Sequence, residues 1–326
     1  MKTAMITGCL GQDGSYLSEY LISLGYYVVG VSRRSSTDAL SYGFLEHLKD
    51  HERFELIHGD ITDPMFLTEV ICKYYPDEFY SLAAQSHVGH SFTNPAMTFQ
   101  IDAASVVNIL SLLQKHSPST KFYQASTSEL FGGLKCPKTG YTEESLLHPR
   151  SPYGVAKLAA HWSTINFREA YGMYACAGIL FNHGGPRRGL DFVERKVTHD
   201  VARIKLNLQE SITMGNIDAY RDWGHSKDYV KAMHLMLQQE TPKEYVIATG
   251  EAYSIKDLLE ATFLLADLGD YQQYIKFDEK FMRPSEVDYL KGNPSKAKKE
   301  LNWKPEYNFY KLIEEMYLED LKNLKR

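Results

Sequence analysis

The stretch Gly8-Cys9-Leu10-Gly11-Gln12-Asp13-Gly14 decides the fold of this chain, because it joins a short apolar run to the first helical pattern. Gly8 allows a tight turn, and Gly11 lets the backbone approach a pyrophosphate. Gly14 permits close contact between helix and strand, and the start of the helix supplies N–H donors to an anion. The placement predicts a dinucleotide site. The motif alone is weak evidence, since a purely structural turn uses the same glycines.

Short apolar runs alternate with helical patterns through the first half of the chain. Strands are predicted at 3–7, 27–32, 54–58, 78–82, 121–125 and 175–181, with helices at 16–24, 64–74 and 103–116 between them. Strands that are apolar on both faces and separated by amphipathic helices form a parallel sheet covered on both sides. The chain is therefore predicted to be α/β, with a doubly wound parallel sheet.

The alternation of strands and helices changes after residue 181. A basic loop precedes a predicted helix at 193–207, and a helix at 226–239 and a strand at 244–248 return to the sheet. This order predicts a dinucleotide-binding domain from 1–181 plus 219–250. A smaller, discontinuous α/β lobe, from 182–218 plus 251–326, would bind the substrate. The ligand is expected between the carboxyl edge of the sheet and this lobe.

Composition excludes several classes of protein. The 326 residues are 44% hydrophobic and 24% charged, as in ordinary globular proteins, and a net charge of −5 argues against nucleic-acid binding. The first residues run straight into a strand, and no segment approaches the length needed to cross a bilayer. The scattered cysteines predict reduced thiols and no metal site: Cys9, Cys72, Cys136 and Cys176. We expect a cytoplasmic protein that contacts neither nucleic acid nor membrane.

The second predicted strand ends in Ser32-Arg33-Arg34-Ser35-Ser36. A carboxylate at this place would accept hydrogen bonds from a ribose and favour NAD. Two guanidinium groups and two hydroxyls suit a 2′-phosphate instead, so NADP is the predicted cofactor, with a solvated basic turn as the alternative. Asp60, after the third strand, is placed to meet the adenine; a helix cap using Thr62 or Asp63 is the competing explanation.

Four residues carry the predicted chemistry. Tyr153 and Lys157 are four residues apart, on one face of a predicted helix. Lys157 is expected to lower the pKa of Tyr153 and to hold the nicotinamide ribose, so that Tyr153 accepts a proton from a substrate hydroxyl as hydride leaves. Thr127 and Glu129 follow the fifth strand. Thr127 would bind the sugar oxygen, and Glu129 adds the second acid/base that elimination of water requires; a surface cap is the alternative for Glu129.

Blocks spread from residue 5 to about 305 resemble the GDP-mannose 4,6-dehydratase family of extended short-chain dehydrogenases/reductases. They include KFYQASTSELFG at 121–132, PRSPYG at 149–154, PRRG at 186–189, RDWGH at 221–225, RPSEVD at 283–288 and LNWKP at 301–305. The resemblance implies a Rossmann-type sheet with a smaller substrate lobe.

The resemblance also implies roles for individual residues. Thr127, Glu129 and Tyr153 would be catalytic, and Lys157 would position the cofactor. NADP contacts would come from Gly8, Gly11, Gln12, Asp13, Gly14, Arg33, Arg34, Ser35, Ser36, Asp60, Ile61, Leu82, Ala83, Ala84, Gln85, Ser86, Tyr153, Lys157, His183 and Arg188. A GDP-linked sugar would be held by Asn182, Lys196, Arg221, Arg283 and Glu286. The two arginines suit a diphosphate independently of the resemblance, and Glu286 suits ribose hydroxyls.

The implied reaction converts GDP-mannose to GDP-4-keto-6-deoxymannose with internal recycling of hydride on NADP. Tyr153 would take the C4 hydroxyl proton, and Glu129 would take the C5 proton and protonate the departing C6 hydroxyl. A nucleotide-sugar 4-epimerase and a noncatalytic NADP-binding sensor are the rival interpretations.

Some positions depart from the family pattern. Gly184-Gly185 stand where the family has Glu-Ser, which would leave space for a bulkier sugar and makes a GDP-manno-heptose dehydratase an alternative. Met97 stands at the place of a cofactor-contacting tyrosine. Tyr42-Gly43-Phe44 alter a loop that assembles tetramers in relatives, so homodimer and homotetramer both stay open.

Overall fold

A seven-stranded parallel sheet forms the centre of the molecule. The computed structural model describes residues 1–34, 42–278, 280 and 284–325. The strands lie in the order β11-β6-β5-β4-β1-β2-β3, and every neighbouring pair is parallel. Their bounds are β1 Thr3–Thr7, β2 Tyr27–Ser32, β3 Phe54–His58, β4 Glu78–Ser81, β5 Lys121–Thr127, β6 Ala175–Leu180 and β11 Tyr245–Ile247. This confirms the predicted doubly wound α/β fold.

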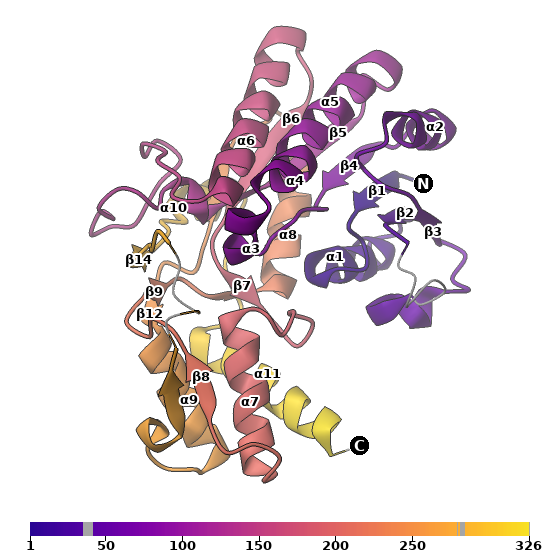
Figure 1. Cartoon of the computed structure of the whole chain (residues 1–326). Coiled ribbons are helices and arrows are strands. Elements are labelled where there is room, and N and C mark those ends of the chain that lie inside the picture. Colours follow the sequence, from indigo (N-terminus) through magenta and orange to yellow (C-terminus); the bar gives the residue numbers. More distant parts are fainter. Residues whose placement is uncertain (35–41, 279, 281–283, 326) are drawn as a thin grey trace.

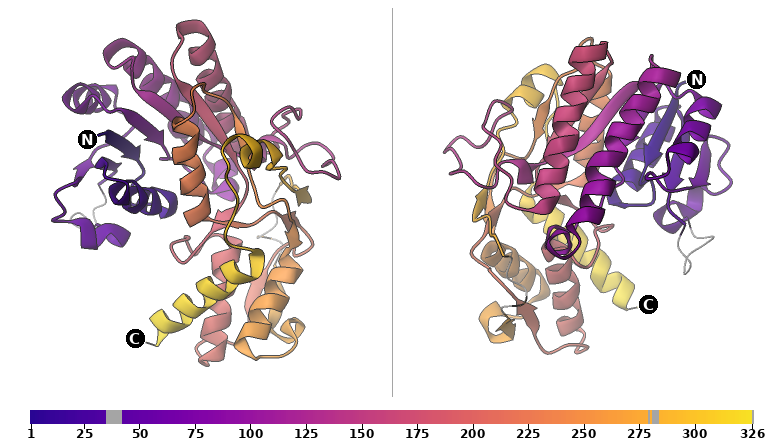
Figure 2. Two further views of the ribbon diagram at one scale, coloured as in Figure 1. Left: turned by 180° about the vertical axis from the view of Figure 1, so that it is seen from behind. Right: turned by 45° about the horizontal axis from the view of Figure 1, so that its top comes forward.

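Helices cover both faces of the sheet (Figures 1 and 2). Ala4 and Ile6 of β1 pack with α1 (Gln12–Ser23) and α8 (Ser226–Leu237). Met5, between them, points to the opposite face, because side chains alternate along a strand. That face is covered by α2 (Pro64–Tyr74), α5 (Ser105–His116) and α6 (Pro152–Tyr171). The remaining short elements near the sheet are η1 Gly43–Leu48, α3 Val88–Thr93, α4 Pro95–Phe99, η2 Gln100–Ala104 and η3 Ser128–Leu130.

A second lobe lies beside the sheet (Figure 1). It has its own apolar core. Its helices are α7 Val193–Lys205, α9 Ile255–Ala266 and α11 Phe309–Leu324, and its 3-10 turn is η4 Tyr271–Tyr274. Its short strands are β8 Ile212–Met214, β9 Tyr220–Arg221, β12 Tyr253–Ser254, β13 Ile275–Phe277 and β14 Tyr289–Leu290. Between the lobe and the sheet, β7 (His183–Gly184) pairs with β10 (Gly224–His225).

The exact division of the chain into two domains stays a prediction. The late helix α10 (Ser295–Glu300) lies in the part of the chain assigned to the substrate lobe. Its Ala297, with Leu301 and Trp303 after it, packs into the core between the sheet and α1 and α8. The chain thus returns to the sheet before α11 completes the second lobe.

One helical stretch corrects an expectation about length. The helices α4, η2 and α5 run on continuously from Pro95 to His116, and this segment is long and apolar enough to cross a membrane, with a mean hydropathy of 1.5. The expectation that no segment approaches that length is therefore wrong. In this fold 44% of the apolar window is buried, and Val106, Ile109 and Leu113 pack against the sheet. Core helices of this length and composition also occur in proteins without a membrane span.

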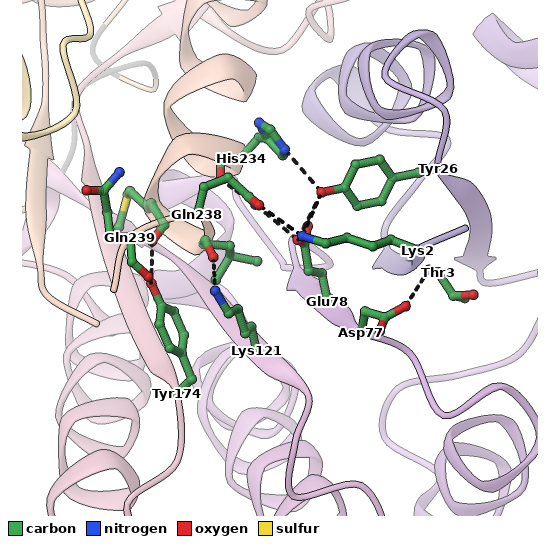
Figure 3. A network of polar contacts seen from close by, with 12 residues as sticks. Lys2, Thr3, Tyr26, Asp77, Glu78, Lys121, Tyr174, His234, Gln238 and Gln239 are labelled. Atoms are coloured by element: carbon green, nitrogen blue, oxygen red, sulfur yellow. Dashed lines mark hydrogen bonds and ion pairs between the residues drawn. The ribbon is translucent and has the colours of Figure 1, made fainter. Parts of the chain in front are cut away.

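The amino edge of the sheet carries a closed polar network around Glu78, the first residue of β4 (Figure 3). Its Oε1 accepts hydrogen bonds from Lys2 Nζ at 3.1 Å, Tyr26 OH at 3.0 Å and Gln238 Nε2 at 3.0 Å. Its Oε2 accepts from Tyr80 OH at 2.7 Å. Both oxygens of a carboxylate that is only 1% exposed therefore have partners. The network ties the starts of β1 and β4 to the end of α8.

Candidate functional site

A cavity of about 1730 Å³ lies at the carboxyl edge of the sheet, against the second lobe. Nearly all described residues of the predicted site line it: Gly8, Gly11, Gln12, Asp13, Gly14, Arg33, Asp60, Ile61, Leu82, Ala83, Ala84, Gln85, Ser86, Thr127, Glu129, Tyr153, Lys157, Asn182, His183, Arg188, Lys196, Arg221 and Glu286. Arg34 is described but is not among the lining residues. Ser35, Ser36 and Arg283 lie outside the described residues. One cavity therefore brings together residues that are far apart in the sequence.

The glycine turn between β1 and α1 has no room for side chains. A Cβ on Gly14 would lie 2.3 Å from the carbonyl oxygen of Gly8, and Gly8 itself has φ +73° and would place a Cβ 2.9 Å from Ala83 Cα. Gly11 caps α1 without a side-chain hydrogen bond from any described residue. The first N–H groups of α1 are thus available to an anion in the cavity.

Asp13 is held by His183 of β7, between the sheet and the second lobe. Its Oδ2 lies 2.8 Å from His183 Nε2, and His183 Nδ1 lies 2.7 Å from the carbonyl oxygen of Phe181. Burial by itself would raise the pKa of Asp13, but His183, Gln12 and Arg188 together lower it to about 2. Asp13 is therefore a stable anion that joins the phosphate turn to β7.

The sequence left two roles open in this region, an adenine contact and a helix cap, and Asp60 and Asp63 each take one of them. Asp63 caps α2, accepting hydrogen bonds from the backbone of Met65 and Phe66. Asp60 lines the cavity, while its Oδ1 accepts from the N–H and the hydroxyl of Thr62 at 2.9 and 2.8 Å. The helix cap is thus supplied by Asp63, which leaves Asp60 at the cavity wall.

Thr127, Glu129, Tyr153 and Lys157 converge on the cavity from two elements. Thr127 ends β5, and its Oγ1 accepts a hydrogen bond from the N–H of Glu129 at 3.2 Å. Glu129 is the middle residue of η3. Tyr153 and Lys157 lie in the first turns of α6, where Ser151 caps the helix by accepting from Gly154 N. Each of the four is at most 9% exposed. A phenol, an ammonium, a hydroxyl and a carboxyl group are therefore available in one cavity.

The pKa of Tyr153 differs from the expectation. Burial raises it well above the usual value, Asp102 and Glu129 raise it further, and Thr127 and Arg188 lower it. The Nζ of Lys157 lies 6.0 Å from the centre of the tyrosine ring. In this structure the pKa of Tyr153 is raised rather than lowered, because desolvation and two carboxylates dominate, and the lowering effect expected of Lys157 stays a prediction.

The predicted ligands of the nucleoside diphosphate sugar lie on the second-lobe side. Arg221 Nη2 lies 3.5 Å from Glu286 Oε1, and the Nζ of Lys196 donates to the carbonyl oxygen of Thr213. The Oδ1 of Asn182 is buried without a hydrogen-bond partner among the described residues. Next to Arg221, the carboxylate of Asp222 accepts from the backbone of residues 249, 250 and 292, which fixes β9 in place.

The Gly184-Gly185 departure does not enlarge the cavity. Neither glycine lines the cavity formed by the described part of the chain. A Cβ on Gly184 would lie 3.3 Å from Cγ of Glu194, whose carboxylate is 2.8 Å from Arg188 Nε. The expectation that these glycines leave space for a bulkier sugar is therefore wrong, because Glu194 fills the space beside Gly184 and His225 fills the space beside Gly185.

Sequence reasoning missed several residues of the site. Glu194 is 1% exposed, lines the cavity and pairs with Arg188, whose guanidinium also lies 3.6 Å from the ring centre of Phe192. Arg187 lines the cavity and reaches α1, where it binds Glu19 at 2.7 Å. Asp102 lies behind the cavity wall and is 1% exposed. A carboxylate within the apolar run 101–110 was the signal for Asp102; Glu194 had no comparable signal.

The comparisons with known proteins agree with this geometry. The family model described as GDP-mannose 4,6 dehydratase matches residues 5–316. GDP-mannose 4,6 dehydratase 1 of Arabidopsis thaliana is 46% identical over 333 residues, which cover 100% of this chain and 91% of that protein.

Solved structures share the fold. The dTDP-glucose 4,6-dehydratase of Bacillus anthracis, in complex with NAD, has a TM-score of 0.83 at 23% identity. The match covers 100% of this chain and 98% of that chain. RMD from Pseudomonas aeruginosa, complexed with NADPH, has a TM-score of 0.81 at 25% identity. The match covers 99% of this chain and 100% of that chain. The family match over nearly the whole length confirms the resemblance seen in the sequence, and this chain belongs to the GDP-mannose 4,6-dehydratase family.

Proposed function

We propose that this protein is an NADP-dependent GDP-mannose 4,6-dehydratase that converts GDP-mannose to GDP-4-keto-6-deoxymannose. The observation that carries the proposal is that Glu129 lines the same cavity as Tyr153, Lys157 and Thr127, in a chain of this family. Tyrosine, lysine and a hydroxyl suffice for oxidation at C4. Elimination of water requires an additional acid/base, and Glu129 has the right chemistry and location for it.

Different side chains of this chain carry out the separate proton transfers. Tyr153 removes the proton of the C4 hydroxyl, and Thr127 hydrogen-bonds the oxygen that becomes the 4-keto group. The keto group acidifies C5–H, so Glu129 takes that proton and gives it to the C6 hydroxyl, which leaves as water. After hydride has been returned to C6, C5 takes up a proton, which restores the C5–H bond of the product. A bound nicotinamide cofactor supplies the hydride acceptor for C4 and the hydride donor for C6. The two lobes exclude water from the keto intermediate.

The fit of a dinucleotide rests on the glycine turn and on Arg33. The turn is so tight that a Cβ on Gly8 or Gly14 would clash with backbone, and α1 begins there without a side-chain cap. The family's relatives by fold are solved with NAD or NADPH, which supports a nicotinamide cofactor. Arg33 follows β2 and lines the cavity, where a guanidinium suits the 2′-phosphate of NADP. Replacement of Arg33 by Asp should reverse the preference for NADP over NAD in equilibrium binding.

The substrate is proposed to bind on the second-lobe side. Arg221 and Lys196 would hold the diphosphate, and Glu286 would accept from ribose hydroxyls. Asn182, whose Oδ1 lacks a partner among the described residues, would bind near the sugar. Arg283 is proposed as a further diphosphate ligand. GDP-mannose is preferred to GDP-manno-heptose, because Glu194 fills the space beside Gly184.

Turnover of GDP-mannose in deuterium oxide tests the reaction. A dehydratase incorporates deuterium at C5 and gives a 4-keto product, which NMR and mass spectrometry detect. A 4-epimerase gives an unlabelled C4 epimer, and a noncatalytic sensor gives no product; either result rejects the proposal. In Glu129→Gln the loss of C5 exchange is expected to exceed the loss of C4 oxidation, measured by single-turnover formation of reduced cofactor.

We also propose that the protein is a cytoplasmic homo-oligomer, a homodimer or a homotetramer. Apolar side chains on neighbouring helices are exposed, with Phe99 at 46%, Val107 at 36%, Val155 at 48% and Trp162 at 56%. The helices α5 and α6 that carry three of them pack side by side (Figure 1). The four cysteines are free thiols, in keeping with a reducing compartment. Light scattering measures the mass of the assembly.

A further inference from the structure

A short loop, residues 184–189, joins β7 to α7 and lies against the first turns of α1. Just before it, the carbonyl oxygen of His183 accepts a hydrogen bond from Gln12 Nε2 at 3.4 Å. Within it, a Cβ on Gly185 would lie 3.5 Å from the hydroxyl oxygen of Tyr16. The loop therefore follows α1 outward from the phosphate turn. Because α7 belongs to the apolar core of the second lobe, the loop connects that lobe to the proposed cofactor end of the cavity.

Arg187, in the middle of this loop, is held on α1 by hydrogen bonds, an ion pair and a cation–π contact. Its Nη1 donates to Ser15 Oγ at 3.0 Å, and its Nη2 donates to the carboxylate of Glu19 at 2.7 Å. Its guanidinium carbon lies 4.0 Å from the ring centre of Tyr16. A guanidinium is planar, so its face can stack on an aromatic ring while its edge donates hydrogen bonds. Arg187 uses both on the same helix.

The side chain of Arg187 is also part of the cavity wall. It lines the cavity together with Arg33, after β2, and Phe44 of η1, whose ring centre is 5.5 Å from the guanidinium carbon. Ser15 and Glu19 are not among the residues that line the cavity in the described part of the chain. The contacts that hold Arg187 on α1 therefore lie outside the cavity, while the loop that they hold forms part of its wall.

The two adjacent arginines hold the loop to different elements. The side chains of Arg187 and Glu19 are 18% and 28% exposed, and Glu19 also lies 3.2 Å from His47 Nε2 of η1. A partly buried, hydrogen-bonded ion pair is stronger than an exposed one. Arg188 pairs instead with Glu194 of α7 at 2.8 Å. The loop is thus attached to α1 through Arg187 and to α7 through Arg188.

We propose that Arg187 and Glu19 form a latch, which holds the loop 184–189 closed beside the cofactor and so sets the rate at which NADP enters and leaves. This inference rests on the proposed function, through its cofactor. Gly185 has φ +156°, and glycines begin and end the loop, so the backbone at both ends can rotate when the latch opens. In the proposed cycle, one cofactor molecule takes hydride from C4 and returns it to C6. Slow exit of the cofactor keeps both steps on one enzyme molecule.

A latch can be distinguished from a direct contact with the cofactor by its kinetics. If the loop must open before NADP enters or leaves, a weaker latch raises the association and dissociation rate constants together. The removal of a direct contact raises the dissociation rate constant alone. Glu19 makes the distinction clear, because it holds Arg187 without lining the cavity.

Stopped-flow fluorescence of NADPH with the full-length protein tests the latch. Mixing with NADPH gives the association rate constant, and displacement of bound NADPH by excess NADP⁺ gives the dissociation rate constant. We expect Glu19→Ala and Arg187→Ala each to raise both constants about tenfold, and the dissociation constant to change by less than about threefold. Alanine at residue 19 keeps α1 intact, because it favours a helix. Unchanged rate constants, or a rise in the dissociation rate constant alone, would overturn the proposal.

The double variant Arg187→Ala with Glu19→Ala tests whether the two residues act through one contact. It should exchange NADPH no faster than Arg187→Ala, because both substitutions break the same ion pair. If the two effects multiply, the residues act independently and no latch exists.

Arg168→Ala is the matched control. Arg168 is 19% exposed and donates to the carboxylate of Glu244 at 2.6 and 3.2 Å, so it is another partly buried ion-paired arginine. It lies in the last turn of α6 and is not among the cavity-lining residues of the described chain. We expect this variant to keep the wild-type rate constants. If it accelerated both as Arg187→Ala does, the effect would be a general one of lost ion pairs and the proposal would fail.

These measurements need no sugar nucleotide, so they separate this inference from the proposed function. Failure of the wild-type protein to bind NADPH would reject the proposed cofactor, and the latch with it. Binding of NADPH with rate constants that Glu19→Ala and Arg187→Ala leave unchanged would reject the latch alone.

Discussion

The two edges of the central sheet each bury a carboxylate, and the two differ in how completely they are paired. At the amino edge, both oxygens of Glu78 accept hydrogen bonds, four in all, from Lys2, Tyr26, Gln238 and Tyr80. At the carboxyl edge, Asp102 accepts one, and its second oxygen has no partner among the described residues. Burial raises the pKa of both, but the partners of Glu78 reverse that shift and lower it. Complete pairing thus favours the charged form of Glu78, whereas burial disfavours the charged form of Asp102.

The largest effect is expected from Tyr153→Phe at the carboxyl edge. The change deletes one hydroxyl, whose side-chain hydrogen-bond partner is Thr127 in the same cavity, and leaves the buried ring in place. We expect kcat to fall about 10³-fold, while the free energy of unfolding and cofactor affinity stay close to wild type. Steady-state kinetics, with urea unfolding as the companion measurement, check this. Substantial residual turnover would remove Tyr153 from the proposed chemistry.

Glu78→Ala should give the opposite result at the amino edge. It leaves Lys2, Tyr26, Gln238 and Tyr80 without their shared acceptor, so we expect a loss of about 3 kcal/mol in the free energy of unfolding. Turnover well below the melting temperature should be unchanged, because the network lies at the far edge from the cavity. Lys2→Met serves as control and should cost less, since Lys2 is half exposed and supplies one of four bonds. A large loss of kcat in folded Glu78→Ala would contradict the division between edges.

The pH dependence of stability should have opposite signs at the two edges. The folded-state pKa of Glu78 is lowered, so its contribution is present above the unfolded value of 4.5 and is lost as pH falls. The folded-state pKa of Asp102 is about 6 against an unfolded 3.8, so its ionisation costs stability as pH rises from about 4 to about 6.

Denaturant unfolding from pH 4 to pH 8 measures these contributions. Asp102→Asn should be more stable than wild type at pH 7, on the order of 2 kcal/mol, with the gain vanishing toward pH 4. Glu78→Gln should be less stable at pH 7, with the deficit shrinking in acid. If both variants were less stable than wild type at pH 7, the pairing of the carboxylates would not distinguish the two edges.

The smallest effect is expected from Glu194→Gln. The charge of Glu194 holds Arg188, whose guanidinium also acts electrostatically on Asp13 and Tyr153. Loss of that charge should weaken NADP binding about tenfold with little change in stability. Fluorescence titration measures the dissociation constant. In the double variant Gly184→Glu with Glu194→Ala, a carboxylate enters the same space from the opposite side. This variant should recover part of the affinity for NADP. No recovery would show that Glu194 acts through packing alone.

Much of the fold was predictable because it depends on local patterns. The strands before Gly8 and before Arg33 are apolar runs of the length observed, and the glycine turn has the conformation its residues require. Boundaries were less certain: β5 extends to Thr127, beyond the predicted end at 125, because it pairs with β6 from Phe122 to Thr127. The short strands of the second lobe, such as β8 and β13, were not predicted, since two or three residues form a strand only when a distant partner is present.

The site was predictable where its residues lie at strand ends or are separated by one helical turn. It was not predictable where segments distant in the sequence meet. The spacing of Tyr153 and Lys157 is local, and so is the turn that links Thr127 to Glu129. The position of Glu194 beside Gly184 and that of Asp102, in the turn η2 that packs against α6, depend on packing between separate elements. The direction of the Tyr153 pKa shift likewise required burial to be known, because desolvation outweighs any effect of its sequence neighbours.

By itself, the sequence determined the alternation of strands and helices, the phosphate turn and the pairing of a phenol with an ammonium, because periodicity, steric freedom and helical spacing act over a few residues. The tertiary structure decided which buried carboxylates are fully paired and which are not. Pairing depends on what lies across the fold, and the free energy of a buried charge is set by those distant partners.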